Sequence, residues 1–185
     1  VFRFAAPALM AGNVGLLKHA SNVPGCGLAI EEVFTKAGFP KDVFKTLMIG
    51  SGLVEQVIRH PHVKAVTLTG SELAGQRVAA IAGDEIKKTV LELGGSDPFI
   101  VLEDADIPAC VATSATARMI NAGQSCIAAK RFIVVEERLK EFEEQQTAIM
   151  KNMKMGDPLD PTVKVGPLAR PDLVDELHEQ VQQSV

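Results

Sequence analysis

The chain has 185 residues, 46% of them hydrophobic, so it is long enough to bury one large core or two smaller ones. Its net charge of -4 and its dispersed lysines and arginines provide no basic field for a phosphate backbone, which argues against nucleic acid as a partner. No apolar run reaches the roughly 18 residues that a membrane span needs, and no signal-peptide pattern is present, so we expect a soluble, cytoplasmic protein without a membrane partner.

The three cysteines, Cys26, Cys110 and Cys126, are odd in number and lack Cys-x-x-Cys or zinc-ligand spacing. Neither a disulfide framework nor a metal site is expected, and at least one thiol should be free. The chain begins at Val1 without a methionine, and FRFAAPALMAG is typical of the inside of a helix in a larger protein. We therefore expect the chain to be a fragment.

The first half alternates short β-rich runs with helical patterns, which predicts a parallel sheet with helical crossovers. Strands are predicted at 14–18, 45–50 and 64–70, and helices at 24–37, at 53–60 and from Ser71 or Glu72 to 84. The residues expected to face the core are Leu28, Val33 and Phe34 in the first helix, Val54, Val57 and Ile58 in the second, and Leu73, Val78, Ile81 and Ala82 in the third.

Two extended runs at 87–102 are separated by Gly94-Gly95, which allows a sharp change of direction, so we place a domain boundary at about Leu93. The alternation then continues, and the whole chain is predicted to be α/β. The predicted elements are a helix at 105–120 with Ile107, Val111, Ala115 and Met119 at intervals of four, a strand at 131–136, a helix at 137–153, a proline-rich connection at 156–171 and a helix at 172–183 with Leu173, Val174, Leu177 and Val181 on one face.

Cys126 ends the sequence NAGQSC, between a predicted helix and a predicted strand. Cys110 sits among apolar neighbours and Cys26 opens a helix, and both are interpreted as structural. Cys126 instead follows Gly-Gln-Ser in a turn that can expose the sulfur and aim backbone N–H groups at whatever bonds to it. Cys126 is therefore the candidate nucleophile.

Glu92 lies between two leucines at the end of a predicted strand. Partial removal from water disfavours its charged form and suits a general base. Taken alone, however, the stretch is explained more simply by a carboxylate that turns outward on an alternating strand.

Two further positions suggest a nucleotide ligand. The sequence TGSELAG, 69–75, joins a strand to a helix, and Gly70, the free N–H groups of the new helix and Gly75 could accommodate a phosphate. Lys18 ends the first strand, at the edge where ligands of open α/β sheets bind. A solvated strand end is the alternative for Lys18, and the turn is not a GxGxxG motif.

Together these features resemble the aldehyde dehydrogenase superfamily. The resemblance covers the strand-end lysine, the TGS turn, LELGGSDPFIV, the Gly-Gln-x-Cys loop, GDPLDP and VGPLA, in the family's order. KHASNVPGC, LELGGSDPF and CIAAKRFIV are similar in particular to bacterial succinate-semialdehyde dehydrogenases. The resemblance implies a Rossmann-like NAD(P)-binding part at 1–92, the start of an α/β catalytic domain at 93–185, and a homo-oligomeric protein acting on a small aldehyde.

The resemblance also implies roles for individual residues. The thiolate of Cys126 would attack the aldehyde, the resulting thiohemiacetal would give its hydride to NAD or NADP, and Glu92 would activate the water that hydrolyses the thioester. The backbone N–H of Cys126 would supply half of the oxyanion hole. Coenzyme contacts would come from Lys18 at the adenosine ribose, Ser71 at the pyrophosphate, Gly70 and Gly75 in that turn, and Leu93 and Gly94 near the nicotinamide.

Ser21 lies three residues after the strand-end lysine, where NAD-preferring members of the family commonly carry a glutamate. A small neutral donor there leaves room for a 2'-phosphate with Lys18 as its countercharge, so we expect NADP to be accepted at least as well as NAD. The alternative is that Ser21 only caps the following helix.

Two other interpretations compete with this one. A cysteine hydrolase would need a histidine oriented on Cys126, and His19, His60, His62 and His178 all lie outside comparable contexts. A truncated, inactive chain that binds only a nucleotide or a partner is the second. The resemblance favours it for the isolated chain, because the family's second oxyanion donor precedes Val1 and its ribose-binding glutamate follows Val185.

Overall fold

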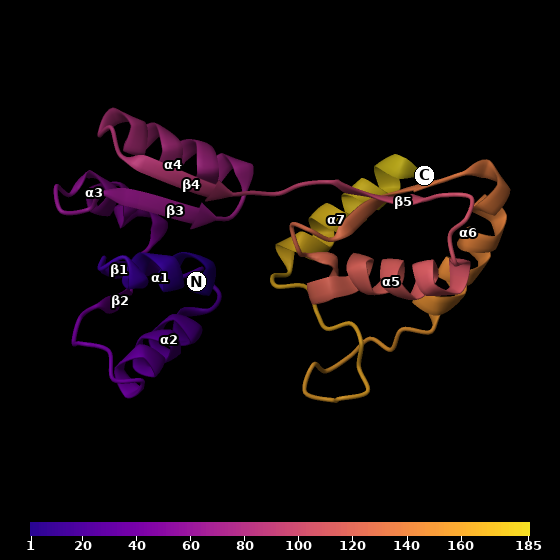
Figure 1. Ribbon diagram of the computed structural model, residues 1–185, viewed down its shortest axis with the longest axis horizontal. Coiled ribbons are helices and arrows are strands. Elements are labelled where there is room, and N and C mark those ends of the chain that lie inside the picture. Colours follow the sequence, from indigo (N-terminus) through magenta and orange to yellow (C-terminus); the bar gives the residue numbers. More distant parts are fainter. The chain divides into compact units, whose positions relative to one another are not determined.

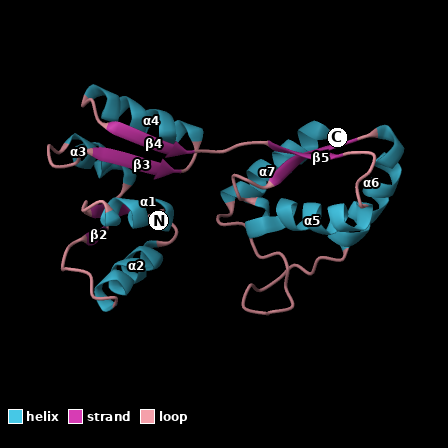
Figure 2. Cartoon of the chain, viewed as in Figure 1, coloured by secondary structure: helices cyan, strands magenta, loops and turns pink.

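The computed structural model describes residues 1–185 as a mixed α/β chain (Figure 1). It divides into two compact units, Val1–Leu93 and Gly94–Val185. Figure 2 shows helices and strands alternating along the chain. The strands pair as three two-stranded parallel sheets: β1 (Gly15–Lys18) with β2 (Phe44–Leu47), β3 (Ala65–Thr69) with β4 (Lys88–Glu92), and β5 (Asp97–Val101) with β6 (Ala129–Val134). The predicted α/β class is confirmed, and the predicted parallel sheet is present as separate pairs rather than as one continuous sheet.

The first unit contains two helical crossovers of the predicted kind, but the strands before and after the predicted helix at 53–60 do not pair with each other. In each of the two crossovers, a helix connects two strands that then pair in parallel. Its elements are α1 (Phe2–Met10), β1 (Gly15–Lys18), α2 (Pro24–Lys36), β2 (Phe44–Leu47), a 3₁₀ turn (Ser51–Leu53), α3 (Val54–Arg59), β3 (Ala65–Thr69), α4 (Glu72–Asp84) and β4 (Lys88–Glu92).

Helix α2 packs on the β1–β2 pair through Gly27 and Phe34. The ring of Phe34 stacks on Phe44 with centroids 4.7 Å apart, and Ala5 of α1 completes this small core. The predicted burial of Phe34 is confirmed, but that of Leu28 and Val33 is wrong, because both are about half exposed. Both side chains lie off the stripe that Gly27 and Phe34 define on the helix.

A polar contact fixes the same helix to β2. The Glu31 carboxylate accepts from the Lys45 ammonium and, at 2.7 Å, from the Thr46 backbone N–H. The hydrogen bond from Lys45, with that from Thr46, holds the pKa of Glu31 below its ordinary value. This contact holds α2 on β2, which pairs with β1, the strand that ends in Lys18.

Helix α4 lies along β3 and β4 (Figure 1). Its Val78 and Ala82 pack against Ile58 of α3, as predicted. Leu73 is the exception, since it is 58% exposed. The buried positions of α4 are Gly75, Val78 and Ala82, at intervals of three and four, and Leu73 falls outside that stripe.

The second unit is built around the β5–β6 pair and two long helices. Its elements are β5 (Asp97–Val101), α5 (Ile107–Met119), a short turn (Ile120–Gly123), β6 (Ala129–Val134), α6 (Glu136–Lys151) and α7 (Asp172–Ser184). The residues expected to face the core from α5 do so, with Ile107, Val111 and Ala115 buried and Met119 partly buried.

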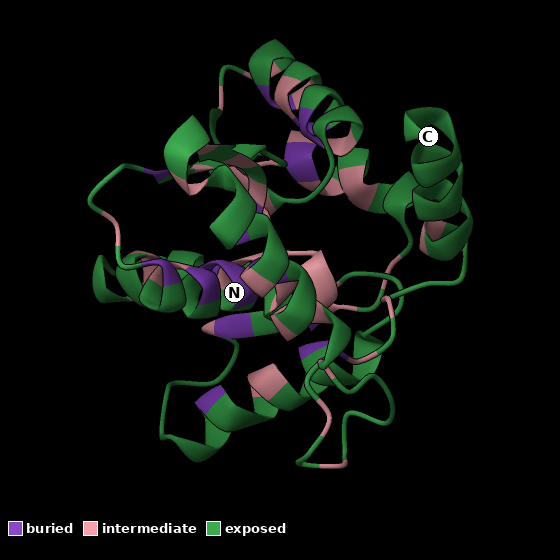
Figure 3. Ribbon diagram, turned by 90° about the vertical axis from the view of Figure 1, so that its right-hand side faces the viewer, coloured by how far each residue is buried: buried purple, intermediate pink, exposed green.

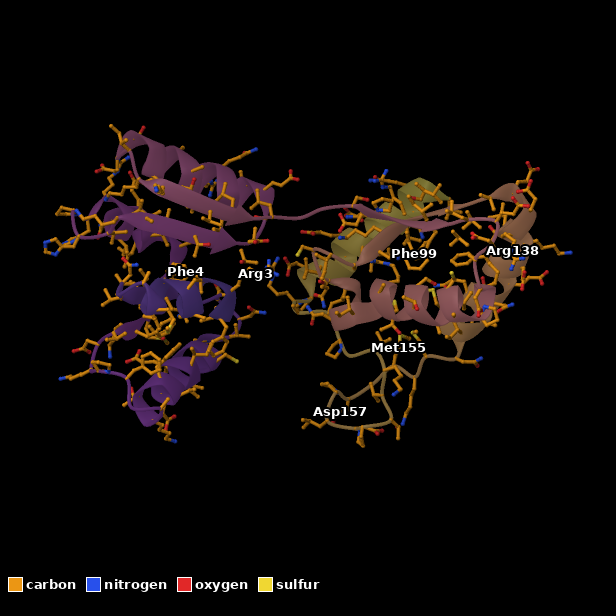
Figure 4. All side chains as sticks on the ribbon, viewed as in Figure 1. Arg3, Phe4, Phe99, Arg138, Met155 and Asp157 are labelled. Atoms are coloured by element: carbon orange, nitrogen blue, oxygen red, sulfur yellow. The ribbon has the colours of Figure 1, made fainter.

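The core of this unit also contains Val101 and Phe142. A buried hydrogen bond of 2.5 Å from Ser114 to Gln146 joins α5 to α6. In Figure 4, Phe99 marks β5 and Arg138 marks α6, while Met155 and Asp157 lie on the long connection that follows.

Helix α7 has no buried residue, and most of its ribbon carries the colour of exposed residues in Figure 3. The predicted helix is confirmed, but its apolar residues Val174, Leu177 and Val181 are each about half exposed. No helix of this chain combines the length and the apolar character that a membrane crossing requires.

Candidate active site

The carboxyl ends of β3 and β4 finish side by side. Thr69 and Glu92, their last residues, are opposite each other in the parallel register, and the N–H of Gly70 donates to the carbonyl of Glu92 at 3.0 Å. Ligands of open α/β sheets bind at this edge. The structure therefore brings the predicted TGS turn and the predicted base together.

The turn leads directly into α4. Ser71 is the N-cap, and its hydroxyl accepts from the N–H of Ala74 at 3.3 Å, so the predicted helix start is confirmed. A Cβ on Gly75 would lie 2.8 Å from the Leu93 side chain, so glycine is what allows helix and strand to approach so closely. The free N–H groups and dipole of α4 suit this turn to a phosphate.

Lys18 ends β1 opposite Leu47, and its side chain is partly buried. Ser21 is exposed in the turn that follows. The N-cap of α2 is Val23 and makes no side-chain capping bond, so the alternative that Ser21 serves only as the helix cap is wrong.

Glu92 carries a partner that sequence analysis did not find. The Arg3 guanidinium, labelled in Figure 4, lies 3.0 Å from the Glu92 carboxylate. The side chain of Glu92 is 36% exposed and that of Arg3 is 76% exposed. Nothing in FRFAAP marks this arginine as functional, because its significance comes from a strand far along the chain.

The loop that carries Cys126 has an unusual backbone. Asn121, Ala122 and Gly123 all have positive φ, at 53°, 54° and 79°. The left-handed conformation costs roughly 1–2 kcal/mol for most residues other than glycine and is less costly for asparagine, so Ala122 in particular stores strain. Such strain persists only where the surrounding structure imposes it.

Side chains impose this shape. Gln124 donates to the carbonyl of Asn121 at 3.0 Å and accepts from the N–H of Ala169 at 2.9 Å, which ties the loop to the VGPLA stretch. The ammonium of Lys130 donates to the carbonyl of Cys126 at 2.7 Å. Cys126 itself is partly buried. Gln124 and Lys130 both stand within stretches that carry the family resemblance, but the sequence indicated no role for either side chain.

The other cysteines differ from each other. Cys110 packs against the core of the second unit, in agreement with its structural interpretation. Cys26 is exposed, so its interpretation as a buried structural thiol is wrong. Its neighbour Gly27 is the residue that faces β2, with the position of its missing Cβ 3.0 Å from Thr46, and this directs Cys26 away from the core.

The candidate residues are thus distributed over both units. Lys18, Ser21, Gly70, Ser71, Gly75, Glu92 and Leu93 belong to the first, and Gly94 and Cys126 to the second. Within the second unit, the position of a Cβ on Gly95 lies 3.6 Å from the carbonyl of Cys126, so the chain after Gly94 runs beside the cysteine loop.

Known proteins are similar to this chain over nearly its whole length. The NADP(+) succinate-semialdehyde dehydrogenase of Mycobacterium avium is 59% identical over 183 residues, which are 99% of this chain and 39% of that protein. The crystal structure of succinic semialdehyde dehydrogenase from Streptococcus pyogenes, in complex with NADP+, is 39% identical with a TM-score of 0.94, over 97% of this chain and 40% of that one.

A structure of aldehyde dehydrogenase C from Pseudomonas syringae, with NAD+ and octanal, is 34% identical with a TM-score of 0.85, over 91% of this chain and 35% of that one. The same fold thus accompanies different coenzymes and aldehydes. The present chain spans about 39% of the length of the curated relatives it matches. The family model of the aldehyde dehydrogenases matches residues 1–185, and the chain belongs to the aldehyde dehydrogenase family.

Proposed function

We propose that the protein containing this chain oxidises an aldehyde to the carboxylic acid with NADP+, and that succinate semialdehyde is its substrate. The observation that carries the proposal is the strained loop that presents Cys126, in a chain 59% identical to an NADP(+) succinate-semialdehyde dehydrogenase. A backbone held in an unfavourable conformation around a cysteine supports a catalytic role rather than a structural one.

The residues of the first unit fit a dinucleotide. The β3–α4 turn offers Gly70, the capping hydroxyl of Ser71 and free helix N–H groups to a pyrophosphate, and Gly75 with Leu93 shapes the adjoining packing. Lys18 and Ser21 would hold the adenosine ribose and its 2'-phosphate. Gly94 would lie near the nicotinamide. The bound coenzyme supplies the hydride acceptor.

Cys126 and Glu92 divide the remaining chemistry. The Cys126 thiolate attacks the aldehyde carbon, and the Cys126 N–H donates to the oxygen as it becomes an alkoxide. The hydride of this adduct would pass to the bound coenzyme, which leaves a thioester on the sulfur. Glu92 then takes a proton from water as the water attacks the thioester, and breakage of the C–S bond releases the carboxylic acid and the Cys126 thiolate. The proton on Glu92 passes to solvent, so both side chains return to their starting state.

Arg3 supports an acidic aldehyde as the substrate. Succinate semialdehyde carries a carboxylate at the end opposite its aldehyde, and a guanidinium binds carboxylates through two parallel hydrogen bonds. Arg3 is largely exposed and lies beside the proposed base.

The test is NADPH formation by the full-length protein with a panel of aldehydes. Succinate semialdehyde should have a higher kcat/KM than an uncharged aldehyde of equal length, and Arg3→Leu should reduce that preference. Cys126→Ser should lower the rate by several orders of magnitude, whereas Cys26→Ser and Cys110→Ser should retain most of it. Comparable loss in Cys110→Ser would sink the assignment of the nucleophile.

A further inference from the structure

Lys130 is the second residue of β6, and its side chain returns to the loop before that strand. The ammonium donates to the carbonyl of Cys126 at 2.7 Å and to the carbonyl of Ser125 at 3.3 Å. The lysine is partly buried, and hydrogen bonds from a charged donor are stronger than those between neutral groups. One side chain thus holds two consecutive carbonyl groups at the proposed nucleophile.

These carbonyls belong to the two peptide groups that flank the Cα of Cys126. Each peptide group is planar, so holding both restricts φ and ψ of Cys126 and thereby the direction of the bond that carries its sulfur. The carbonyl of Ser125 also shares a peptide plane with the N–H of Cys126. A cation on that carbonyl fixes the direction of the N–H and polarises it toward a stronger donor.

We propose that Lys130 is a positioning residue, which holds the peptide groups on both sides of Cys126 so that the sulfur and the N–H act on one aldehyde carbonyl. The inference rests on the proposed function, in which that N–H stabilises the oxyanion. Lys130 acts through the backbone and does not touch the substrate. Its side-chain charge is therefore needed for the rate of the chemical step more than for binding.

The chain contains a matched control. Lys87 in the first unit also donates to two backbone carbonyls, those of Ile58 at 2.5 Å and His60 at 2.9 Å. Replacing either lysine with methionine removes an ammonium and two such bonds and keeps an unbranched side chain. A general loss of stability should appear in both variants, whereas a disturbed nucleophile should appear only in Lys130→Met.

The first measurement is the pre-steady-state burst of NADPH in the full-length protein with succinate semialdehyde. Lys130→Met should slow the burst about 10- to 100-fold, with little change in KM or in the Kd for NADP+, since the oxyanion donor is misaligned rather than removed. Lys130→Arg should recover part of the rate, and Lys87→Met should match the unmutated protein. If Lys130→Met does not fold, Lys130→Gln should show the same loss to a smaller degree.

The second measurement does not depend on activity. Hydrogen exchange of the peptide at 121–128, without substrate or coenzyme, should be faster in Lys130→Met than in the unmutated protein and unchanged in Lys87→Met. Equal bursts and equal exchange in the two variants would overturn the role of Lys130. An unmutated protein that forms no NADPH would contradict the proposed function instead, and the exchange rates would then decide whether Lys130 holds the loop.

Discussion

The turn at 69–75 and the loop at 121–126 both contain glycine and both adjoin a helix, but their shapes have different origins. The turn follows from regular elements: β3 ends, Ser71 caps α4, and Gly75 lets the helix approach Leu93. The loop departs from regular structure at Asn121 and Ala122 and is held by side-chain bonds, from Lys130 to the carbonyl of Cys126 and between Gln124 and the N–H of Ala169. Helix capping and packing therefore shape the turn, whereas side-chain bonds to the backbone shape the loop.

The difference matches the work proposed for each. A phosphate is bound by backbone N–H groups that any capped helix start provides, so regular structure is sufficient. A nucleophile must present its sulfur and an oxyanion donor to one atom, and this geometry is sensitive to displacements of about 1 Å. Strain of roughly 1–2 kcal/mol per left-handed residue is then tolerated, because the geometry cannot be reached otherwise.

The largest effect is expected where the two regions must cooperate. Glu92 ends β4 beside the turn, and its proposed role is hydrolysis of the thioester on Cys126. Glu92→Gln should retain the burst of NADPH and lower steady-state turnover about 100- to 10,000-fold, because only the step after hydride transfer needs the base. Stopped-flow absorbance separates the two phases.

Glu85→Gln is a suitable control for that variant. Glu85 is also paired with an arginine, Arg59 at 3.0 Å, and its side chain is similarly exposed, but it lies at the opposite end of α4. Its loss should leave both phases nearly unchanged. Absence of the burst in Glu92→Gln, with Cys126 still titratable, would mean that Glu92 acts before hydride transfer.

Coenzyme choice tests the first region alone. Ser21→Glu places a carboxylate where a 2'-phosphate would lie, and like charges brought together disfavour binding. The ratio of kcat/KM for NADP+ to that for NAD+ should fall about tenfold or more, which corresponds to about 1.4 kcal/mol. Lys18→Met should lower the same ratio by removing the countercharge. Strong NAD+ preference in the unmutated protein, unaltered by Ser21→Glu, would show that other residues set specificity.

The same difference explains what could be predicted from the sequence. The elements follow from local signals: Ser71 and Asp106 both cap helices through their side chains, and Ile107 and Val111 mark a buried stripe. Which face of a helix is buried depends on its partner, and for this reason Leu28 was wrongly assigned to the core.

The predicted residues of the candidate site came from short motifs, and their neighbours did not. Arg3 acquires a possible role only by lying 3.0 Å from Glu92, and Gln124 gains a second bond only because Ala169 returns to the loop. Lys130 could have been suspected only if its side chain were known to fold back on Cys126. Local periodicity indicates which residues share a face of a helix or strand, but not which side chain will meet a given backbone group or a given distant residue. Sequence patterns alone therefore could not find these contacts.

Gly75→Ala tests whether the turn depends on regular packing. The added Cβ would lie 2.8 Å from the Leu93 side chain, so that side chain must move, and overpacking of this kind costs about 1–3 kcal/mol, less the gain of about 0.4–1 kcal/mol that alanine brings by restricting the unfolded chain. Gly83→Ala in the same helix meets nothing within 4 Å and should stabilise by about 0.4–1 kcal/mol. Urea unfolding and NADP+ titration should show Gly75→Ala less stable and weaker in binding. Equal stability of the two variants would mean that Leu93 yields freely.

Ala122→Gly tests the strain in the loop, with a smaller and opposite effect on stability. Glycine removes a left-handed penalty of roughly 1–2 kcal/mol but adds about 0.4–1 kcal/mol of unfolded-state entropy, so the variant should be more stable by up to about 1.5 kcal/mol. Ala112→Gly, on the exposed side of α5, should instead destabilise by about 1 kcal/mol. Urea midpoints at unchanged slope measure both changes.

Glycine adopts the left-handed conformation without strain, so the contacts that shape the loop should remain. The burst rate of Ala122→Gly should therefore stay close to that of the unmutated protein. Equal destabilisation of the two variants would show that Ala122 is not held in the left-handed region.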